Sequence, residues 1–180
     1  MATSTTPLTM DDFERLPSEL AETHELVDGE LVPVAANTPE HNLLRADTCQ
    51  LLKMFVKERH LGMVIDEQEF DFLGAGHAPD VSFFGTDKRH LLDMHKRVQR
   101  FVPDLAIEIE SESDTDAGLI RKKNRYLQAG VREVWLISTE GREVRVYTAD
   151  GRRLLSGTDR ITTDLLPGFS VPVSEFFALT

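Results

Sequence analysis

The chain has 180 residues, 41% hydrophobic and 28% charged, proportions typical of a globular protein rather than a disordered or fibrous one. Its net charge of −11 argues against non-specific nucleic-acid binding, because phosphate contacts supply most of that affinity. No apolar run reaches the roughly 20 residues that cross a bilayer, and residues 1–9 lack a secretory signal pattern. We expect one domain over residues 1–180, frayed at 1–9, in the reducing cytoplasm that the lone Cys49 favours.

The first third of the sequence predicts a short helix, a hairpin and a long helix. The short helix is expected from residue 9 to residue 16. Residues 24–32 predict a hairpin, because Asp28-Gly29 is a turn signal between two apolar runs. Thr38-Pro39 is typical of a helix start, and apolar residues at helical spacing continue from there to Gly62.

The remaining two thirds alternate between strands and helices. Strands are predicted at 63–66, 68–73, 79–84, 105–109, 133–137 and 143–148. One helix is predicted at 91–99. A second helix is predicted to run to Gln128 from a cap at Ser113, Asp114 or Thr115. Pro167-Gly168 predicts a turn in the tail. Strands mixed with a few helices indicate an α/β sandwich built on a mixed β-sheet flanked by helices.

The predicted strand at 105–109 carries acids on one face. Leu105, Ile107 and Ile109 share the apolar face, whereas Asp104, Glu108 and Glu110 share the other. Carboxylates two residues apart on one face repel each other. A bound divalent cation would remove that repulsion, so the strand predicts half of a metal site.

Two further elements can complete such a site. Asp80 opens the strand 28 residues before Glu108, and Lys122 follows Glu108 by 14 residues on the next helix. If the two strands are neighbours, both carboxylates and the Ile109 carbonyl form a hard oxygen site suited to Mg²⁺ or Mn²⁺. An ammonium beside it would orient water or stabilise charge on a phosphoryl group.

Three groups of residues resemble the Uma2 family, whose members are described as bacterial endonucleases of the PD-(D/E)XK superfamily. They are Pro79-Asp80-Val81, the stretch from Pro103 to Ile109, and the stretch from Lys122 through Tyr126 and Gly130 to Trp135. Residues 24–32, His41 and Leu166-Pro167-Gly168-Phe169 are also similar. The resemblance spans residues 10–177 and implies a restriction-endonuclease-like mixed sheet with extra β-hairpins.

The resemblance also implies roles for individual residues. Asp80 and Glu108 would be the metal carboxylates and Lys122 the catalytic lysine, with Lys123 as the fallback. Glu30 would add a ligand or a water contact. The chain departs from the family pattern at Ser111-Glu112-Ser113, where Ser-Pro-Ser is usual, at His24, where tyrosine is usual, and in the extra acid Glu110.

Other conspicuous residues have simpler interpretations. His41 is either a general base or the donor of a local hydrogen bond. Asp104 and Glu110 are expected at the surface or behind the site. We expect Trp135 and Tyr126 in the core.

The predicted function is Mg²⁺-dependent hydrolysis of DNA phosphodiester bonds by a homodimer with twofold symmetry. One alternative is a catalytically inactive member that serves as a binding or regulatory module, which the net charge and Glu110 favour. A third is a metal-dependent phosphohydrolase of a small substrate.

Overall fold

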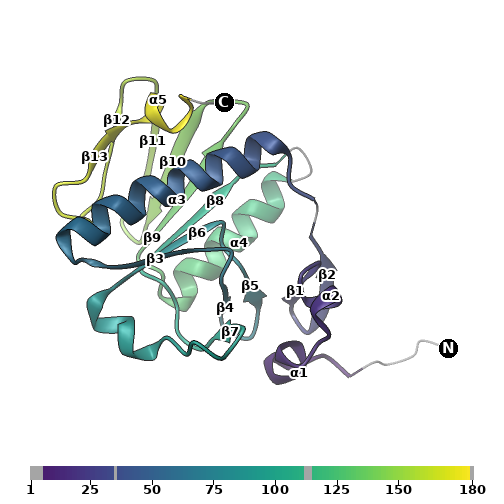
Figure 1. Cartoon of the computed structure of the whole chain (residues 1–180). Coiled ribbons are helices and arrows are strands. Elements are labelled where there is room, and N and C mark those ends of the chain that lie inside the picture. The colour runs from purple at the N-terminus through teal and green to yellow at the C-terminus, as the bar shows by residue number, and fades with distance from the viewer. Residues whose placement is uncertain (1–5, 35, 112–114, 179–180) are drawn as a thin grey trace.

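A mixed six-stranded sheet forms the centre of the computed structural model, which describes residues 6–34, 36–111 and 115–178 (Figure 1). Its strand order is β11-β10-β9-β8-β6-β3. In chain order the strands are β3 (Gly62–Asp66), β6 (Val81–Gly85), β8 (Leu105–Ile109), β9 (Glu133–Ser138), β10 (Glu143–Thr148) and β11 (Gly151–Ser156). Only the central pair, β8 with β9, is parallel among these neighbours. The expected strand at 105–109 therefore lies inside the sheet, as predicted.

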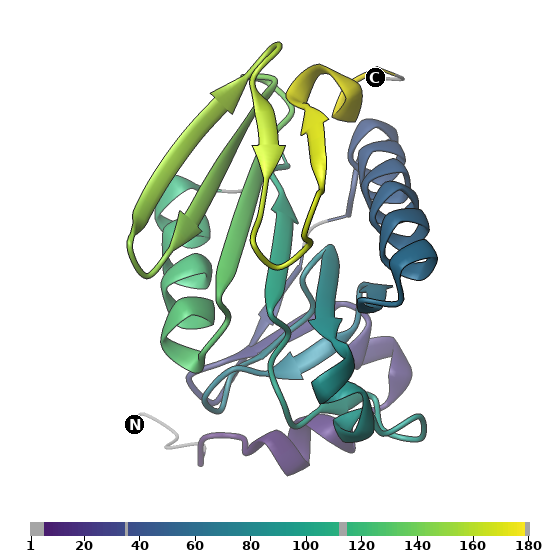
Figure 2. The same ribbon diagram turned by 90° about the vertical axis from the view of Figure 1, so that its left-hand side faces the viewer.

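Two helices cover opposite faces of this sheet, α3 (Pro39–Arg59) and α4 (Asp116–Ala129) (Figure 2). Thr38 caps α3 through its side chain, and Pro39 follows at the first position. Thr115 caps α4 by accepting a hydrogen bond from the Gly118 amide; the other two expected cap residues lie outside the described residues. Gly130 ends α4 with φ of +105°, a conformation that favours glycine. Both helices thus form close to where the sequence predicts them.

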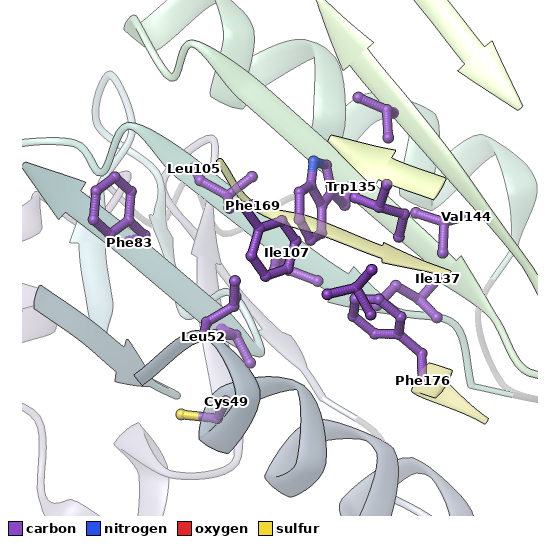
Figure 3. Close-up of a cluster of buried hydrophobic side chains, with 14 of the residues drawn as sticks. Cys49, Leu52, Phe83, Leu105, Ile107, Trp135, Ile137, Val144, Phe169 and Phe176 are labelled. Carbon is purple, nitrogen blue, oxygen red and sulfur yellow. The ribbon is translucent and has the colours of Figure 1, made fainter. Parts of the chain in front are cut away.

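The alternation along β8 divides the core into two layers. Leu105 and Ile107 pack on the α3 side with Trp135 (Figure 3), and Ile109 belongs to the same cluster. Ala106 packs on the α4 side with Tyr126. Trp135 and Tyr126 are fully buried, as expected, and Cys49 is buried at the edge of the α3 layer. Glu108 shares the α4 side with Ala106, so an acid faces the inside of the molecule.

A second sheet lies at one end of the first and has the order β2-β1-β5-β4-β7 (Figure 1). Its strands are β1 (His24–Val27), β2 (Glu30–Pro33), β4 (Glu69–Asp71), β5 (Gly76–His77) and β7 (Val98–Gln99). The expected hairpin at 24–32 is the β1–β2 pair. The two short helices beside it are α1 (Met10–Glu14) and α2 (Ser18–Ala21).

Residues 1–9 were expected to be frayed, but Leu8 and Thr9 are held by hydrogen bonds. Residues 1–5 lie outside the described residues. The Leu8 amide donates to the Gly29 carbonyl at 2.9 Å, and Thr9 forms a reciprocal capping box with Asp12. The chain is therefore anchored from Leu8 onward.

The C-terminal segment extends the α3 layer. It contains β12 (Arg160–Thr162), β13 (Ser170–Pro172) and α5 (Val173–Phe176). Phe169 and Phe176 pack their rings against Trp135. No helix in the described part of the chain is long and apolar enough to span a membrane.

The helix expected at 91–99 is wrong. The chain forms a 3₁₀ helix, η1 (Thr86–Leu91), then a loop that leads into β7. The Gln99 side chain accepts a hydrogen bond from the Asp93 amide and donates to the Asp93 and Lys96 carbonyls. These bonds stabilise a non-helical conformation of residues 93–99. Met94 is 78% exposed, so no apolar surface favours a helical turn here.

Candidate active site

Asp80 and Glu108 lie side by side because of the register between β6 and β8. The two strands are antiparallel and pair Val81 with Ile107, which places Asp80 beside Glu108 one step further along. Oδ2 of Asp80 accepts a hydrogen bond from the Ile109 amide at 2.7 Å. The sequence-based expectation that these strands are neighbours is confirmed.

The oxygens of Glu108 point at α4 and contact two of its side chains. The Tyr126 hydroxyl donates to Oε1 at 2.6 Å, and Lys122 Nζ lies 3.3 Å from Oε2. Lys122 and Tyr126 are one helical turn apart and so share a face of α4. Tyr126 is therefore both a core residue and a partner of the acid, a second role that the sequence did not reveal.

A third carboxylate, Glu25 of β1, shares the same ammonium. Lys122 Nζ lies 3.0 Å from Oε1 of Glu25, and Nδ1 of His77 lies 3.0 Å from Oε2. Sequence reasoning missed both residues. A signal was present, since Glu25 sits in a short apolar strand beside the buried Leu26, but its partners lie far away in the chain.

Burial and crowding alter the acidity of this group. Burial, reinforced by the charges of Asp80 and Glu25, raises the pKa of Glu108 to about 7 even though Lys122 opposes the change. Burial also favours a higher pKa for Glu25, but His77 and Lys122 outweigh it and bring the pKa to about 2. Burial disfavours the charge on Lys122, yet Glu108 and Glu25 raise its pKa above the ordinary value. Lys122 is therefore an ammonium, suited to hold charge rather than to remove a proton.

His41 approaches the group from α3. Its Nε2 lies 3.1 Å from the Ile109 carbonyl oxygen and 3.3 Å from Oδ2 of Asp80. Burial acts to lower the pKa of His41, but the hydrogen bond and the charge of Asp80 raise it overall. The hydrogen bond of His41 thus joins α3 to β8, 68 residues away in the chain, and is not the local bond expected from the sequence.

These side chains line a cleft of about 840 Å³. Its walls include the β1–β2 hairpin, the N-terminal half of α4, and the segment from Glu67 to Asp80. The exposed fractions of the side chains are 6% for Glu108, 12% for Asp80, 14% for Glu25 and 23% for Lys122. These four side chains are therefore mostly buried, but solvent reaches them through the cleft.

Four residues considered from the sequence lie outside this group. Glu30 is exposed on β2 and does not line the cleft. Glu110 pairs with Arg145. Asp104, expected at the surface or behind the site, is buried and lies 2.9 Å from Lys88. Lys123, the fallback for the catalytic lysine, lies over the Tyr147 ring at 4.7 Å. The structure brings together Asp80, Glu108 and Lys122, and places Glu25 where Glu30 was expected.

A family model matches residues 10–174 of the chain: Uma2, described as "Putative restriction endonuclease". The chain belongs to the Uma2 family. A crystal structure of "a putative nuclease belonging to DUF820" from Anabaena variabilis has the same fold, with a TM-score of 0.83. The two sequences are 19% identical, and the match covers 96% of this chain and 98% of the other. No curated protein matches the chain. The predicted family and the mixed α/β nuclease-like fold are confirmed.

The donor set of this Uma2 protein fits a hard cation in part. Two carboxylates and the Ile109 carbonyl converge from β6 and β8, and Mg²⁺ commonly binds one or two carboxylates and keeps several waters. Among residues 6–34, 36–111 and 115–178, no three His, Cys, Asp or Glu side chains are arranged to hold a metal ion. The protein therefore offers an incomplete oxygen shell that water and substrate would have to complete.

Proposed function

We propose that this Uma2 protein is a metal-dependent endonuclease that hydrolyses phosphodiester bonds in DNA. The observation that carries the proposal is the pairing of Asp80 with Glu108 at the end of two antiparallel strands, with Lys122 within 3.3 Å of Glu108. Carboxylates that can hold a metal, with an ammonium nearby, are groups that can stabilise the charge developing in phosphoryl hydrolysis. The family description and the fold of the cyanobacterial neighbour agree with this chemistry.

Asp80, Glu108 and the Ile109 carbonyl would hold Mg²⁺ or Mn²⁺. The bound metal would polarise a phosphoryl oxygen and make its bound water more acidic. Burial, and then the charges of Asp80 and Glu25, raise the pKa of Glu108, and a cation bound here would favour its charged form. His41 would orient the Ile109 carbonyl and Asp80 from the side of α3.

Lys122 would stabilise negative charge on the phosphoryl group. Its ammonium is held between Glu25 and Glu108, at 3.0 and 3.3 Å. A cation already fixed in place needs little reorganisation when charge develops next to it. Glu25 is a positioning residue in this scheme, and His77 holds Glu25 in turn.

The alternative interpretation, a catalytically inactive family member, was favoured by the net charge and by Glu110, and the surroundings of Glu110 no longer favour it. The extra acid Glu110 pairs with Arg145 of β10, so its charge is balanced outside the cleft. The net charge of −11 remains an argument for weak nucleic-acid binding. A homodimer remains a prediction, which sedimentation of the purified chain would test.

The decisive experiment compares two buried glutamates on neighbouring strands. Glu108→Gln should abolish Mg²⁺- or Mn²⁺-dependent cleavage of DNA, a loss of roughly 1,000-fold or more, because a metal contributes several kcal/mol to transition-state stabilisation. Glu133→Gln is the matched control. Glu133 is buried to the same extent, and its carboxylate accepts from Trp135 and Thr163 outside the cleft, where an amide can serve both.

Cleavage and Mn²⁺ binding by calorimetry should both be lost in Glu108→Gln and kept in Glu133→Gln, with both variants folded by circular dichroism. If Glu108→Gln cleaves DNA as well as the original chain does, the proposed function is wrong.

A further inference from the structure

The depth of the proposed catalytic group restricts the substrate that can reach it. The side chains of Glu108 and Asp80 are only 6% and 12% exposed. A phosphodiester must therefore enter the cleft to meet them, rather than touch them from the surface. The cleft volume of about 840 Å³ is in the range of pockets that hold a drug-sized molecule, about 300–1,000 Å³.

Two ion pairs tie the β1–β2 hairpin to α4 across one side of the cleft. Arg125 of α4 lies 2.7 Å from Asp28 in the hairpin turn, and Lys122 lies 3.0 Å from Glu25 of β1. The group is thus bounded by the hairpin on one side and by the helix on the other. Because a duplex would have to bring both backbones to this boundary together, the arrangement favours a single strand.

The charges of the cleft also oppose a duplex. Of the described residues that line it, seven are acids and four are bases. Arg97 pairs with Glu69, Arg125 with Asp28, and Lys122 with Glu25 and Glu108. Arg121 joins none of these pairs and is exposed. Proteins that grip duplex DNA commonly make 6–10 phosphate contacts, and this cleft offers far fewer.

Two exposed valines, Val32 of β2 and Val34 after it, lie at the edge of the cleft. Val32 is paired directly opposite Glu25 in the hairpin, so its side chain lies on the same face. Val32 and Val34 line the cleft and are 41% and 42% exposed. An exposed apolar edge beside a polar group favours a ligand that is itself partly apolar, such as an unpaired base attached to its phosphate.

We propose that the substrate is single-stranded DNA, threaded between the β1–β2 hairpin and α4, with Arg121 contacting a phosphate next to the cleaved bond and Val32 contacting a base. This inference rests on the proposed hydrolysis. The balance of atoms is that of hydrolysis: water adds to phosphorus, one P–O bond breaks, and the leaving oxygen takes a proton.

The first test compares one labelled oligonucleotide as a single strand and as a blunt duplex, with bis(p-nitrophenyl) phosphate as a small substrate, all in Mg²⁺ or Mn²⁺. The single strand should be cut at least about tenfold faster than the duplex, because opening a duplex costs a few kcal/mol. Equal or faster cutting of the duplex overturns the inference and leaves the proposed function standing. Hydrolysis of the small ester alone overturns it in favour of a small-molecule phosphohydrolase. If none is hydrolysed, the proposed function itself fails.

The second test measures how Arg121→Ala binds and cuts the single strand. We expect KM to rise about fivefold with kcat little changed, and the slope of log K against log salt to flatten by about 0.7, the value for one lost phosphate contact on a single strand. Arg152→Ala, an exposed arginine on β11 away from the cleft, is the matched control and should change neither. An unchanged KM and slope in Arg121→Ala would remove Arg121 from the substrate path and overturn this placement of the strand.

Discussion

Glu108 and Glu133 lie on the two parallel strands at the centre of the sheet, and both are buried, yet their surroundings differ. Glu133 accepts hydrogen bonds from the Trp135 indole at 2.5 Å and from the Thr163 hydroxyl at 3.0 Å. Both donors are neutral, and Glu133 does not share them with a second acid. Glu108 has one neutral donor, Tyr126, and shares the Lys122 ammonium with Glu25. The two acids are thus equally buried but differ in charge environment: Glu133 has two neutral donors, whereas Glu108 competes with Glu25 for one cation.

The position of each acid along the parallel pair agrees with this distinction. Glu108 is near the carboxyl end of β8, and Glu133 is at the amino end of β9 on the opposite face. In open α/β sheets, ligands bind outside the carboxyl ends of parallel strands. The α4 face at this end opens into the cleft, whereas the surroundings of Glu133 are closed by the C-terminal segment through Thr163.

Removing the shared cation should produce the largest loss of stability. Lys122→Met removes the cation that Glu25 and Glu108 share, although His77 still contacts Glu25 and Tyr126 still donates to Glu108. Breaking a buried ion pair in this way costs about 3–5 kcal/mol. Urea denaturation would measure the free energy of unfolding. Lys123→Met is the control. Among the described residues, the Lys123 ammonium contacts the Tyr147 ring and Asn124, contacts worth about 1 kcal/mol at most. Similar losses in both variants would contradict the shared-cation interpretation.

The stability of Glu108→Gln relative to the original chain should depend on pH. The pKa of Glu108 is raised from 4.5 to about 7 on folding, so the folded chain keeps a proton that the unfolded chain loses in that interval. The contribution of Glu108 to the free energy of unfolding therefore falls as pH rises through this window and levels off above it.

Glutamine does not titrate, so the variant should gain roughly 3 kcal/mol relative to the original chain between about pH 4.5 and pH 8. Denaturation curves collected across this interval would measure the gain. Parallel pH profiles for the two chains would show that burial does not perturb Glu108.

The smallest effect is expected at Glu133. Thr163→Val removes one of its two donors and should cost about 1–2 kcal/mol of unfolding free energy, because a carboxylate oxygen is left without its partner. Cleavage should be unaffected, since the contact lies outside the cleft. Thr163→Ser, which keeps the hydroxyl, should recover most of the stability; a loss of cleavage in Thr163→Val would mean that the two acids are coupled.

Several features could be predicted from local patterns. Period-two alternation identified β8 and the inward face of Glu108, helical spacing and caps identified α3 and α4, and Asp-Gly identified the β1–β2 hairpin. That β6 and β8 are neighbours was expected from the sequence, which places Asp80 beside Glu108; that they are antiparallel was decided by the tertiary structure.

Local pattern failed where several contacts from distant segments decide the outcome. Residues 91–99 have helix-forming side chains, but the Gln99 side chain and the pairing of β7 with β4 hold them in another conformation. Glu30 matched the family signature, but it lies exposed at the turn end of β2, while Glu25 on the facing strand reaches Lys122.

The amino-acid sequence by itself determined the mixed α/β sheet, because periodicity is recorded in neighbouring residues. Its motifs, through their resemblance to Uma2, indicated the family and three of the residues that meet in the cleft. Only the tertiary structure decided that Glu25 shares the lysine, that Tyr126 holds Glu108, and that Arg145 neutralises Glu110. Those contacts join segments far apart in the chain, and ion pairs of this kind depend on distance and burial, which no local pattern encodes.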